Sequence, residues 1–261
     1  IIASLLPTGS RTALYYADRI NQLPLGVLGI ALGTVLLPEM SARLALNDRD
    51  GSDSAQNRTA ALPLLLILPF AAVFIAIPDT IMRAIFAHGA FDASAAQLSA
   101  IALATYGVGL PAFALTRIVQ STFYARHDTV TPVRVTVAAI LANIAMKIVF
   151  VWGLHLGIAG VALGTSFGAW LNVCVLTWIG HKGGLLRISP SLKRAILPVL
   201  LAAIATAAGA LIAVKFGARF VPHIGLHDVV LLALAFVLGT AAYGAVVLLF
   251  RKRLPLGRFA G

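Results

Sequence analysis

The stretch "YYADRINQLPLGVLGIALGTVLLPEMSARL", residues 15 to 44, places Asp18 and Arg19 directly before a long run of apolar, glycine-rich residues. An α-helix needs about 20 apolar residues to cross the roughly 30 Å hydrocarbon core of a bilayer. The run reaches that length. It therefore predicts a membrane-spanning helix that carries an acid and a base near one end.

The composition extends this prediction to the whole chain. Of the 261 residues, 60% are hydrophobic and 11% are charged, whereas a soluble domain has about 45–50% apolar and about 25% charged residues. Unpaired backbone groups in lipid are costly, which favours helices over open sheets. We expect an all-α polytopic membrane protein with about seven full spans, near 12–42, 60–78, 97–123, 133–153, 156–180, 195–216 and 228–250.

The order of these blocks predicts four parts. Residues 1–11 should be the end of a truncated helix and an outer loop, because nothing at the N-terminus looks like a start or a signal peptide. A bundle of five spans over 12–180 and a basic linker over 181–194 should follow, and then two C-terminal helices with a basic tail over 195–261. Between the second and third spans, residues 78–95 begin with a proline and an aspartate, which predicts a short interfacial helix.

The net charge of +11 lies mostly in the connections between apolar blocks, which argues against nucleic acid as a partner. If the C-terminus is cytoplasmic, three loop residues, Arg11, Arg83 and Arg219, lie outside and twelve lie inside. This asymmetry follows the positive-inside rule and predicts that orientation. The inside residues are Arg43, Arg49, Arg58, Arg126, Lys182, Arg187, Lys193, Arg194, Arg251, Lys252, Arg253 and Arg258.

The charged pair at the start of the first span admits two interpretations. An arginine at the bilayer centre costs roughly 2.5–3.5 kcal/mol on insertion scales, so Arg19 needs water, a partner or a ligand. It could extend to the outer interface and pair with Asp18, or it could face a hydrated cavity and bind an anion. Pro24 favours a kink nearby, and Gly26, Gly29 and Gly33 suit a moving gate; close helix packing explains the glycines equally well.

Two further charged residues lie inside apolar blocks. Arg117 is near the cytoplasmic end of its span and could extend to the interface or line a cavity. Lys147 is nearer the middle, with Asn143 one turn earlier on the same face. The two could form a polar site in which the ammonium replaces a bound monovalent cation, or Lys147 could simply pack against neighbouring carbonyl groups.

Motifs of catalysis are absent from the sequence, which contains no HExxH, GxSxG or Walker A pattern. Cys174 is the only cysteine, and no histidine cluster has metal-ligand spacing. We therefore expect no enzyme, no metal and no cofactor.

Four stretches in order resemble one family. "YYADRINQLPLGVLGIALGTVLLPEMS" resembles the eighth helix of the MurJ (MviN) lipid II flippases, members of the MOP transporter superfamily. "IFAHGAFD" is similar to the family's outer-loop motif, "FYARHDTVTPV" to its loop between helices ten and eleven, and "GIAGVALGTSFGAWLN" to its twelfth helix. The resemblance runs from the end of helix seven through helix fourteen.

This resemblance implies a transporter that moves lipid II, the undecaprenyl-diphosphate-linked peptidoglycan precursor, across the bacterial cytoplasmic membrane by alternating access. It implies a second lobe of a two-lobed fold, which needs an N-terminal lobe as its partner, and a lipid-tail groove supplied by 195–216 and 228–250. By position, Arg19 would contact the diphosphate and Asp18 would orient it. Gln22 stands where some relatives have an acid, which makes the cavity here less anionic. A related MOP exporter, for polysaccharide-lipid or for drugs by cation antiport, and a non-transporting membrane scaffold remain as alternatives.

Overall fold

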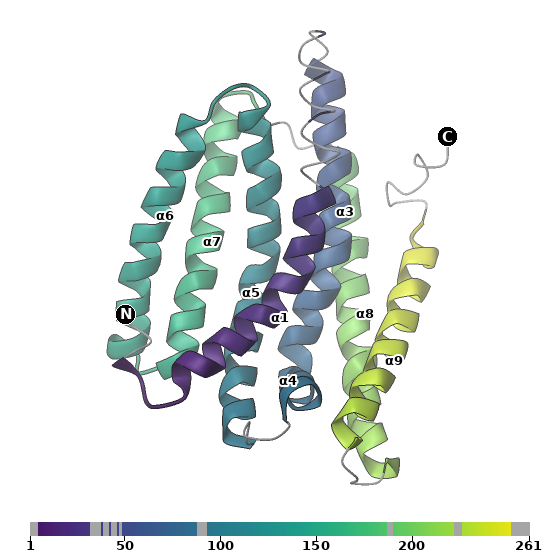
Figure 1. The fold of residues 1–261 in the computed structure, drawn as a ribbon. Helices are drawn as coiled ribbons and strands as arrows, with labels where there is room; N and C mark the ends of the chain where they lie inside the picture. The colour runs from purple at the N-terminus through teal and green to yellow at the C-terminus, as the bar shows by residue number, and fades with distance from the viewer. Residues whose placement is uncertain are drawn as a thin grey trace.

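A computed structural model describes residues 5–31, 38, 42, 46, 49–87, 93–186, 190–221 and 226–251. Every regular element in these ranges is a helix, which confirms the all-α class (Figure 1). The helices are α1 (Ser10–Ala31), α3 (Arg49–Ala76), α4 (Pro78–Phe86), α5 (Ala93–Tyr124), α6 (Val130–Ile148), which continues as a π-helical turn (Val149–Gly153), α7 (Gly157–Lys182), α8 (Pro190–Phe220) and α9 (His227–Leu249).

Five of the described helices are long and apolar enough to cross a membrane: α5, α6 with its π-helical turn, α7, α8 and α9. A sixth span is possible if the bent pair of 63–76 and 78–86 counts as one, although the two pieces meet at 88°. The first expected span, 12–42, lies only partly in the described residues, where α1 covers its first two thirds. Helices α3 and α8 begin earlier than expected, at Arg49 and Pro190.

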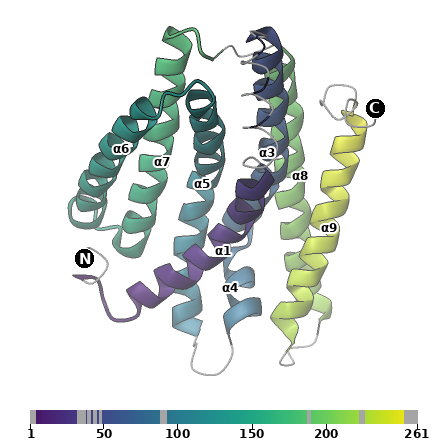
Figure 2. The same ribbon diagram turned by 45° about the horizontal axis from the view of Figure 1, so that its top comes forward.

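The helices form two groups that meet where α3 packs against α5. Helices α5, α6 and α7 pack together on one side, and α3, α8 and α9 pack together on the other (Figures 1 and 2). Helix α1 crosses obliquely in front of α5, and α3 contacts α5 along the boundary between the groups. The main apolar core therefore lies where α1, α3, α4 and α5 meet.

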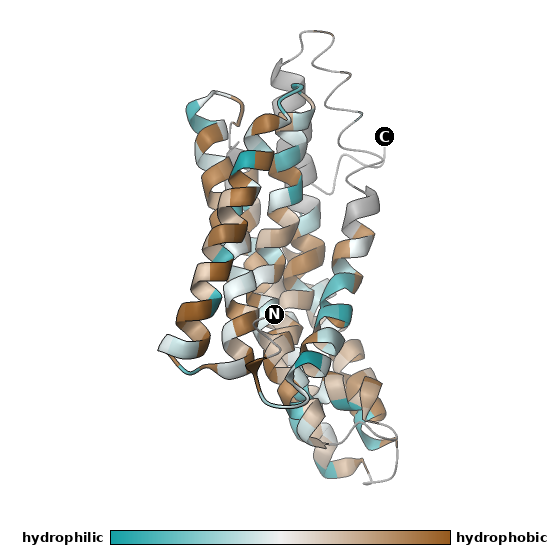
Figure 3. Cartoon of the chain, turned by 60° about the vertical axis from the view of Figure 1, so that its left-hand side comes forward, coloured by the Kyte–Doolittle hydropathy of each residue, from teal (hydrophilic) through white to brown (hydrophobic). Residues whose placement is uncertain are grey.

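Large apolar side chains also cover the outside of the bundle, as expected for lipid-facing helices. Apolar residues run along the outward faces as well as the inner ones (Figure 3). Helix α6 exposes Val133, Val137, Leu141 and Ile144, and α9 exposes Phe236. A soluble domain would hide most of this surface.

The predicted short helix after the second span is present as α4, which begins at Pro78. Its first turn carries Asp79, which pairs with Arg83 one turn later at 2.9 Å (Nε to Oδ2). The opposite face buries Ile81 and Met82 in the core. Residues 88–92 of the predicted segment lie outside the described residues, and residues 93–95 already belong to α5.

The connection between α5 and α6 is built from two hydrogen-bonded caps. His127 adopts a left-handed φ of 61°, and the N–H groups of His127 and Asp128 donate to the carbonyls of Tyr124 and Phe123, the pattern of a Schellman motif. Asp128 Oδ1 then accepts the backbone N–H of Thr131 at 2.9 Å in the first turn of α6. The backbone and hydroxyl hydrogen bonds from Thr131 lower the pKa of Asp128.

Candidate functional site

Helix α1 has one buried face and one open face. Ala13, Ala17 and Ile20 are buried in the core against α5. Tyr15 and Arg19, one helical turn apart, lie on the open face and are exposed. The charged residue that prompted the cavity hypothesis is therefore directed away from the core.

Arg19 is held by the aromatic side chain one turn before it. Its Nη2 donates to the Tyr15 hydroxyl oxygen at 2.7 Å, and its Cζ lies 4.8 Å from the centre of the Tyr15 ring. In the part of the chain that the structure describes, no carboxylate pairs with Arg19. A guanidinium has five N–H donors, so the remaining donors are available to an anion.

Asp18 makes no hydrogen bond or ion pair with Arg19 among the described residues, so its role in orienting Arg19 stays a prediction. Asp18 Oδ2 instead accepts a hydrogen bond from Gln22 Nε2. Adjacent residues on a helix point in different directions, whereas residues four apart face each other; Tyr15 with Arg19 and Asp18 with Gln22 are such pairs. Gln22 gives the Asp18 carboxylate a hydrogen-bond donor, whereas an acid at this position would offer none.

The proposed gate residues are only partly visible. Helix α1 continues through Pro24 to Ala31. A Cβ added at Gly26 would meet nothing within 4 Å, so close helix packing does not explain this glycine among the described residues. The backbone of Gly29 is helical, and Gly33 lies outside the described residues. The gate stays a prediction.

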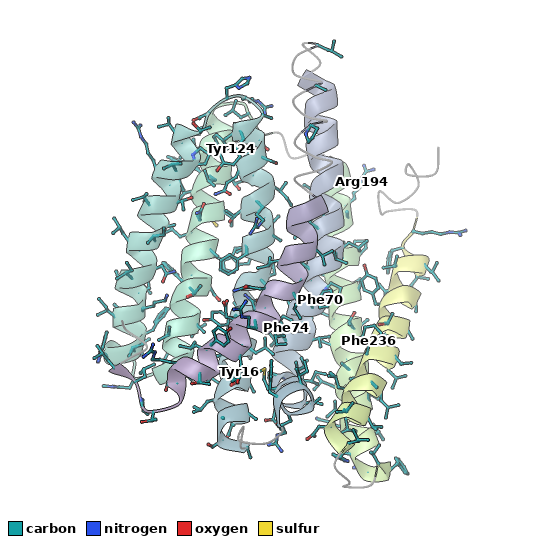
Figure 4. The ribbon with its side chains drawn as sticks, in the orientation of Figure 1. Tyr16, Phe70, Phe74, Tyr124, Arg194 and Phe236 are labelled. Carbon is teal, nitrogen blue, oxygen red and sulfur yellow. The ribbon has the colours of Figure 1, made fainter. Side chains whose placement is uncertain are left out.

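An apolar groove of about 630 Å³ begins on α1 at Ile20, the residue after Arg19. It is walled by α3 on one side and α9 on the other, with α1 and α4 closing it and α8 contributing one residue; Phe70 and Phe74 of α3 and Phe236 of α9 are labelled in Figure 4. From Val229 to Tyr243 the groove follows about 20 Å of α9, at 1.5 Å per residue. The residues from α1 are Ile20, Leu23 and Pro24.

A hydrogen bond from Tyr243 links α9 to α3. Pro69 has no N–H, so the carbonyl of Leu65, four residues earlier, loses its helical donor. The hydroxyl of Tyr243 donates to that carbonyl at 3.0 Å. The two walls of the groove are therefore linked through a carbonyl that a proline has freed. The two residues in this contact are 178 positions apart in the sequence.

Asn143 and Lys147 lie together on the face of α6 that packs against α7. Both meet glycines: a Cβ at Gly164 would come within 2.4 Å of Lys147 Cγ, and one at Gly168 within 2.8 Å of Asn143 Cβ. Oδ1 of Asn143 is buried and has no hydrogen-bond partner among the described residues. The structure thus places the two residues side by side on one face of α6. That the Lys147 ammonium replaces a bound monovalent cation stays a prediction.

Arg117 is exposed on α5 and does not join the Arg19 site. A polar contact that the sequence analysis missed lies one turn further along α5. Thr136 Oγ1 accepts from Asn172 Nδ2 at 3.2 Å and from Gln120 Nε2 at 3.4 Å, which ties α5, α6 and α7 together. The sequence signal for this contact was the presence of three amide or hydroxyl residues within apolar blocks. Which of them meet can be known only from the tertiary structure.

No group of three or more metal-ligating side chains occurs in the described ranges. The polar groups on this part of α1 are the Arg19 guanidinium on the Tyr15 phenol, and the Asp18 carboxylate hydrogen-bonded by the Gln22 amide. Such a set suits binding of an anion rather than of a metal ion.

The comparisons with known proteins agree on one family. The family model described as "Lipid II flippase MurJ" matches residues 1–249. A relative from Rhizobium tropici, named a probable lipid II flippase MurJ, is 40% identical over 186 residues, which cover 71% of this chain and 34% of the relative. A relative of the same name from Haemophilus influenzae is 29% identical over 266 residues, which cover 97% of this chain and 50% of the relative.

The fold has a solved counterpart. A structure titled lipid II flippase MurJ, inward closed conformation, superposes with a TM-score of 0.74 at 23% identity, covering 96% of this chain and 49% of that one. The chain thus spans half, or less, of the length of the relatives described. The solved structure thus confirms the fold, and the sequence comparisons confirm the resemblance carried by the four motifs: the chain belongs to the MurJ lipid II flippase family.

Proposed function

We propose that this chain forms the C-terminal lobe and the two last helices of a flippase that moves lipid II across the bacterial cytoplasmic membrane. The observation that carries the proposal is the position of Arg19 on α1, one residue before Ile20, where the lining of the apolar groove begins. Leu23, one turn after Arg19 on the same open face, is 65% exposed and lines the groove. A guanidinium next to a long apolar groove suits an amphiphile with an anionic head and a hydrocarbon tail.

The chemistry of lipid II fits this arrangement. Arginine presents paired planar donors to phosphate oxygens, and the attraction strengthens where water is excluded. The prenyl tail can stay in the groove between α3 and α9 while the diphosphate reaches Arg19. Asp18, engaged by Gln22, leaves the positive charge of Arg19 unneutralised by any described carboxylate.

A partner lobe is part of the proposal. The relatives are at least twice as long as the matched region, and the open face of α1 carries Arg19 outward. Alternating access in such transporters is the rocking of one bundle against another around a fixed site. We expect inward-facing binding of the diphosphate, closure around the head group, and outward release; the chain without a partner lobe should not transport.

The orientation rests on charge. The C-terminus is placed in the cytoplasm because basic residues are concentrated in the connections on that side. Lys182 Nζ lies 4.1 Å from the centre of the Trp178 ring at the end of α7; an aromatic and a cation at a helix end suit a membrane interface. Lys147, with no described anionic partner, would serve as a fixed positive charge where an ion could otherwise bind.

Complementation tests the proposal. The test protein, called the hybrid, joins residues 1–261 behind the N-terminal half of the Rhizobium tropici relative, and it is expressed in cells depleted of their own lipid II flippase. We expect rescue by the hybrid, and loss of rescue by Arg19→Ala at equal expression. Arg219→Ala is the matched control, because Arg219 is also exposed but lies over Phe216 in α8, 5.6 Å from that ring centre.

Three results would count against the proposal in different ways. Rescue by Arg19→Ala and Arg19→Lys alike would make Arg19 an interfacial anchor. Failure of the folded, membrane-inserted hybrid to rescue would point to a different lipid-linked substrate. Transport of lipid II by the chain without a partner lobe would contradict the two-lobed mechanism.

A further inference from the structure

Two arginines and a tyrosine follow one another along the open face of α1. Arg11, Tyr15 and Arg19 are spaced four residues apart, so they lie on successive turns. Arg11 and Tyr15 also line a second cavity, of about 560 Å³, which we call the α1 cavity. Its wall includes the hydroxyl side chains of Thr8 and Thr12.

Tyr15 connects the α1 cavity to Arg19. Its ring forms part of the cavity wall, and its hydroxyl oxygen accepts the hydrogen bond from Arg19 Nη2 at 2.7 Å. A ligand bound at Arg19 therefore has the α1 cavity as its next neighbour toward the start of the helix.

The sites occur along α1 in a definite order. The apolar groove contacts Ile20, Leu23 and Pro24, Arg19 comes next, and the α1 cavity with Arg11 lies at the beginning of the helix. At 1.5 Å per residue, Arg11 is about 12 Å from Arg19 along the axis. From Pro24 back toward the start of α1, the helix therefore presents an apolar groove, then a cation, and then a polar cavity with a second cation.

We propose that the α1 cavity binds the anionic glycopeptide head of the amphiphile whose diphosphate contacts Arg19. Arg11 binds a carboxylate of the peptide, and the Tyr15 ring with the Thr8 and Thr12 hydroxyls contacts the sugar. This proposal rests on the proposed function and adds a head-group subsite to it. The sequence of tail, diphosphate and acidic glycopeptide in the ligand matches the order of groove, Arg19 and cavity.

The charges around the cavity support an anionic ligand. Among the described residues, no carboxylate lies within ion-pair distance of Arg11 or Arg19, and Asp18 accepts from Gln22. Each guanidinium can therefore offer a charge-assisted hydrogen bond to a ligand oxygen. An aromatic ring with flanking hydroxyls offers an apolar face and polar partners, as a pyranose ring requires.

The test compares two probes on the hybrid. Undecaprenyl diphosphate carries the tail and the diphosphate without sugar, and lipid II carries the glycopeptide as well. Binding of each to the purified hybrid in detergent is measured for the unsubstituted protein and for Arg11→Ala, Arg19→Ala and the control Arg219→Ala. Thermal unfolding of each variant checks that the exposed substitutions leave the fold intact, and Arg11→Lys retains the charge if Arg11→Ala does not fold.

The subsite predicts a selective loss. Arg11→Ala should weaken lipid II binding about tenfold, which is the effect of losing one charge-assisted hydrogen bond. The affinity for undecaprenyl diphosphate should stay within about twofold of its original value. This difference between the two probes defines the subsite. Arg19→Ala should weaken both probes. Equal loss of both probes, or of neither, in Arg11→Ala would overturn the subsite alone. Failure of the unsubstituted hybrid to bind either probe would overturn the proposed function, and the subsite with it.

Discussion

The hydroxyl of Tyr243 can be removed without changing the shape of the groove wall. In Tyr243→Phe the ring remains, but the carbonyl of Leu65, freed by Pro69, loses the hydroxyl donor 3.0 Å away. Hydrogen bonds between membrane helices average about 0.6 kcal/mol and reach about 1.7 kcal/mol. Because this carbonyl has no helical donor to return to, we expect a loss of about 1–1.5 kcal/mol in the free energy of unfolding.

The proline makes the explanation testable by a double-mutant cycle. Pro69→Ala restores an N–H four residues after Leu65, so the carbonyl regains a helical donor. In that background, Tyr243→Phe should cost less than about 0.5 kcal/mol, and the coupling between the two positions should be about 0.5–1 kcal/mol.

Equilibrium unfolding of the chain in mixed detergent micelles, followed by circular dichroism, measures these differences. Tyr124→Phe is the control, because Tyr124 is 39% exposed at the end of α5 and should change stability by less than about 0.5 kcal/mol. The reasoning is refuted if Tyr243→Phe costs the same with and without Pro69, since the freed carbonyl would then not be the reason for the contact.

Three other expectations follow from the helix contacts and caps. Gly164→Ala should lower the free energy of unfolding by about 1–3 kcal/mol through overpacking, because its Cβ would clash with Lys147 Cγ. The control Gly26→Ala should lose no stability, since its Cβ would meet nothing within 4 Å. Equal losses in the two variants, measured by unfolding titrations, would contradict this. His127→Gly should raise the midpoint of thermal unfolding, since a left-handed residue costs roughly 1 kcal/mol unless it is glycine, and no change would show that the cap is unstrained. Asp128→Ala should cost about 0.5–2 kcal/mol at pH 7. Because folding lowers the pKa of Asp128, its stabilisation is present above the unfolded pKa of about 3.9 and is lost as the pH falls through the folded value; a difference between the two proteins that stays constant down to pH 2 in unfolding titrations would exclude a role for the charge.

The end of α7 shows that the backbone conformation of His127 is one that glycine adopts in this protein. The C-terminus of α7 is closed by the same pair of hydrogen bonds, from Gly184 N–H to the His181 carbonyl and from Leu185 N–H to the Gly180 carbonyl. There the left-handed position is a glycine with φ of 66°. The same backbone geometry is thus available to glycine at position 127.

Local properties of the chain determined the helices. The length and hydropathy of each block predicted α5, α7 and α9 to within a few residues at most ends, because a helix in lipid must satisfy its own backbone. Pro78 with Asp79 predicted the start of α4 for the same local reason. The partners of Arg19 and Asp18 could also have been predicted, since side chains four residues apart face each other on any helix.

Contacts between distant segments were decided by the tertiary structure. The spacing of Gly160, Gly164 and Gly168 predicts a close helix neighbour, but only the packing identifies Lys147 and Asn143 of α6 as the groups that fill the space. Likewise, Thr136 meets Asn172 and Gln120 because three helices converge.

The apolar groove shows the same division between local and tertiary information. Two C-terminal helices were expected to form it, yet most of its wall opposite α9 comes from α3, α4 and α1. A hydrophobic side chain has no directional partner, so its sequence specifies that it leaves water or faces lipid but not which helix it meets. The sequence by itself therefore determined that this chain is a bundle of membrane helices with a charged first span. The tertiary structure built a cavity before that charge along α1 and an apolar groove after it. The groove exists because packing brings residues as distant as Leu65 and Tyr243 together.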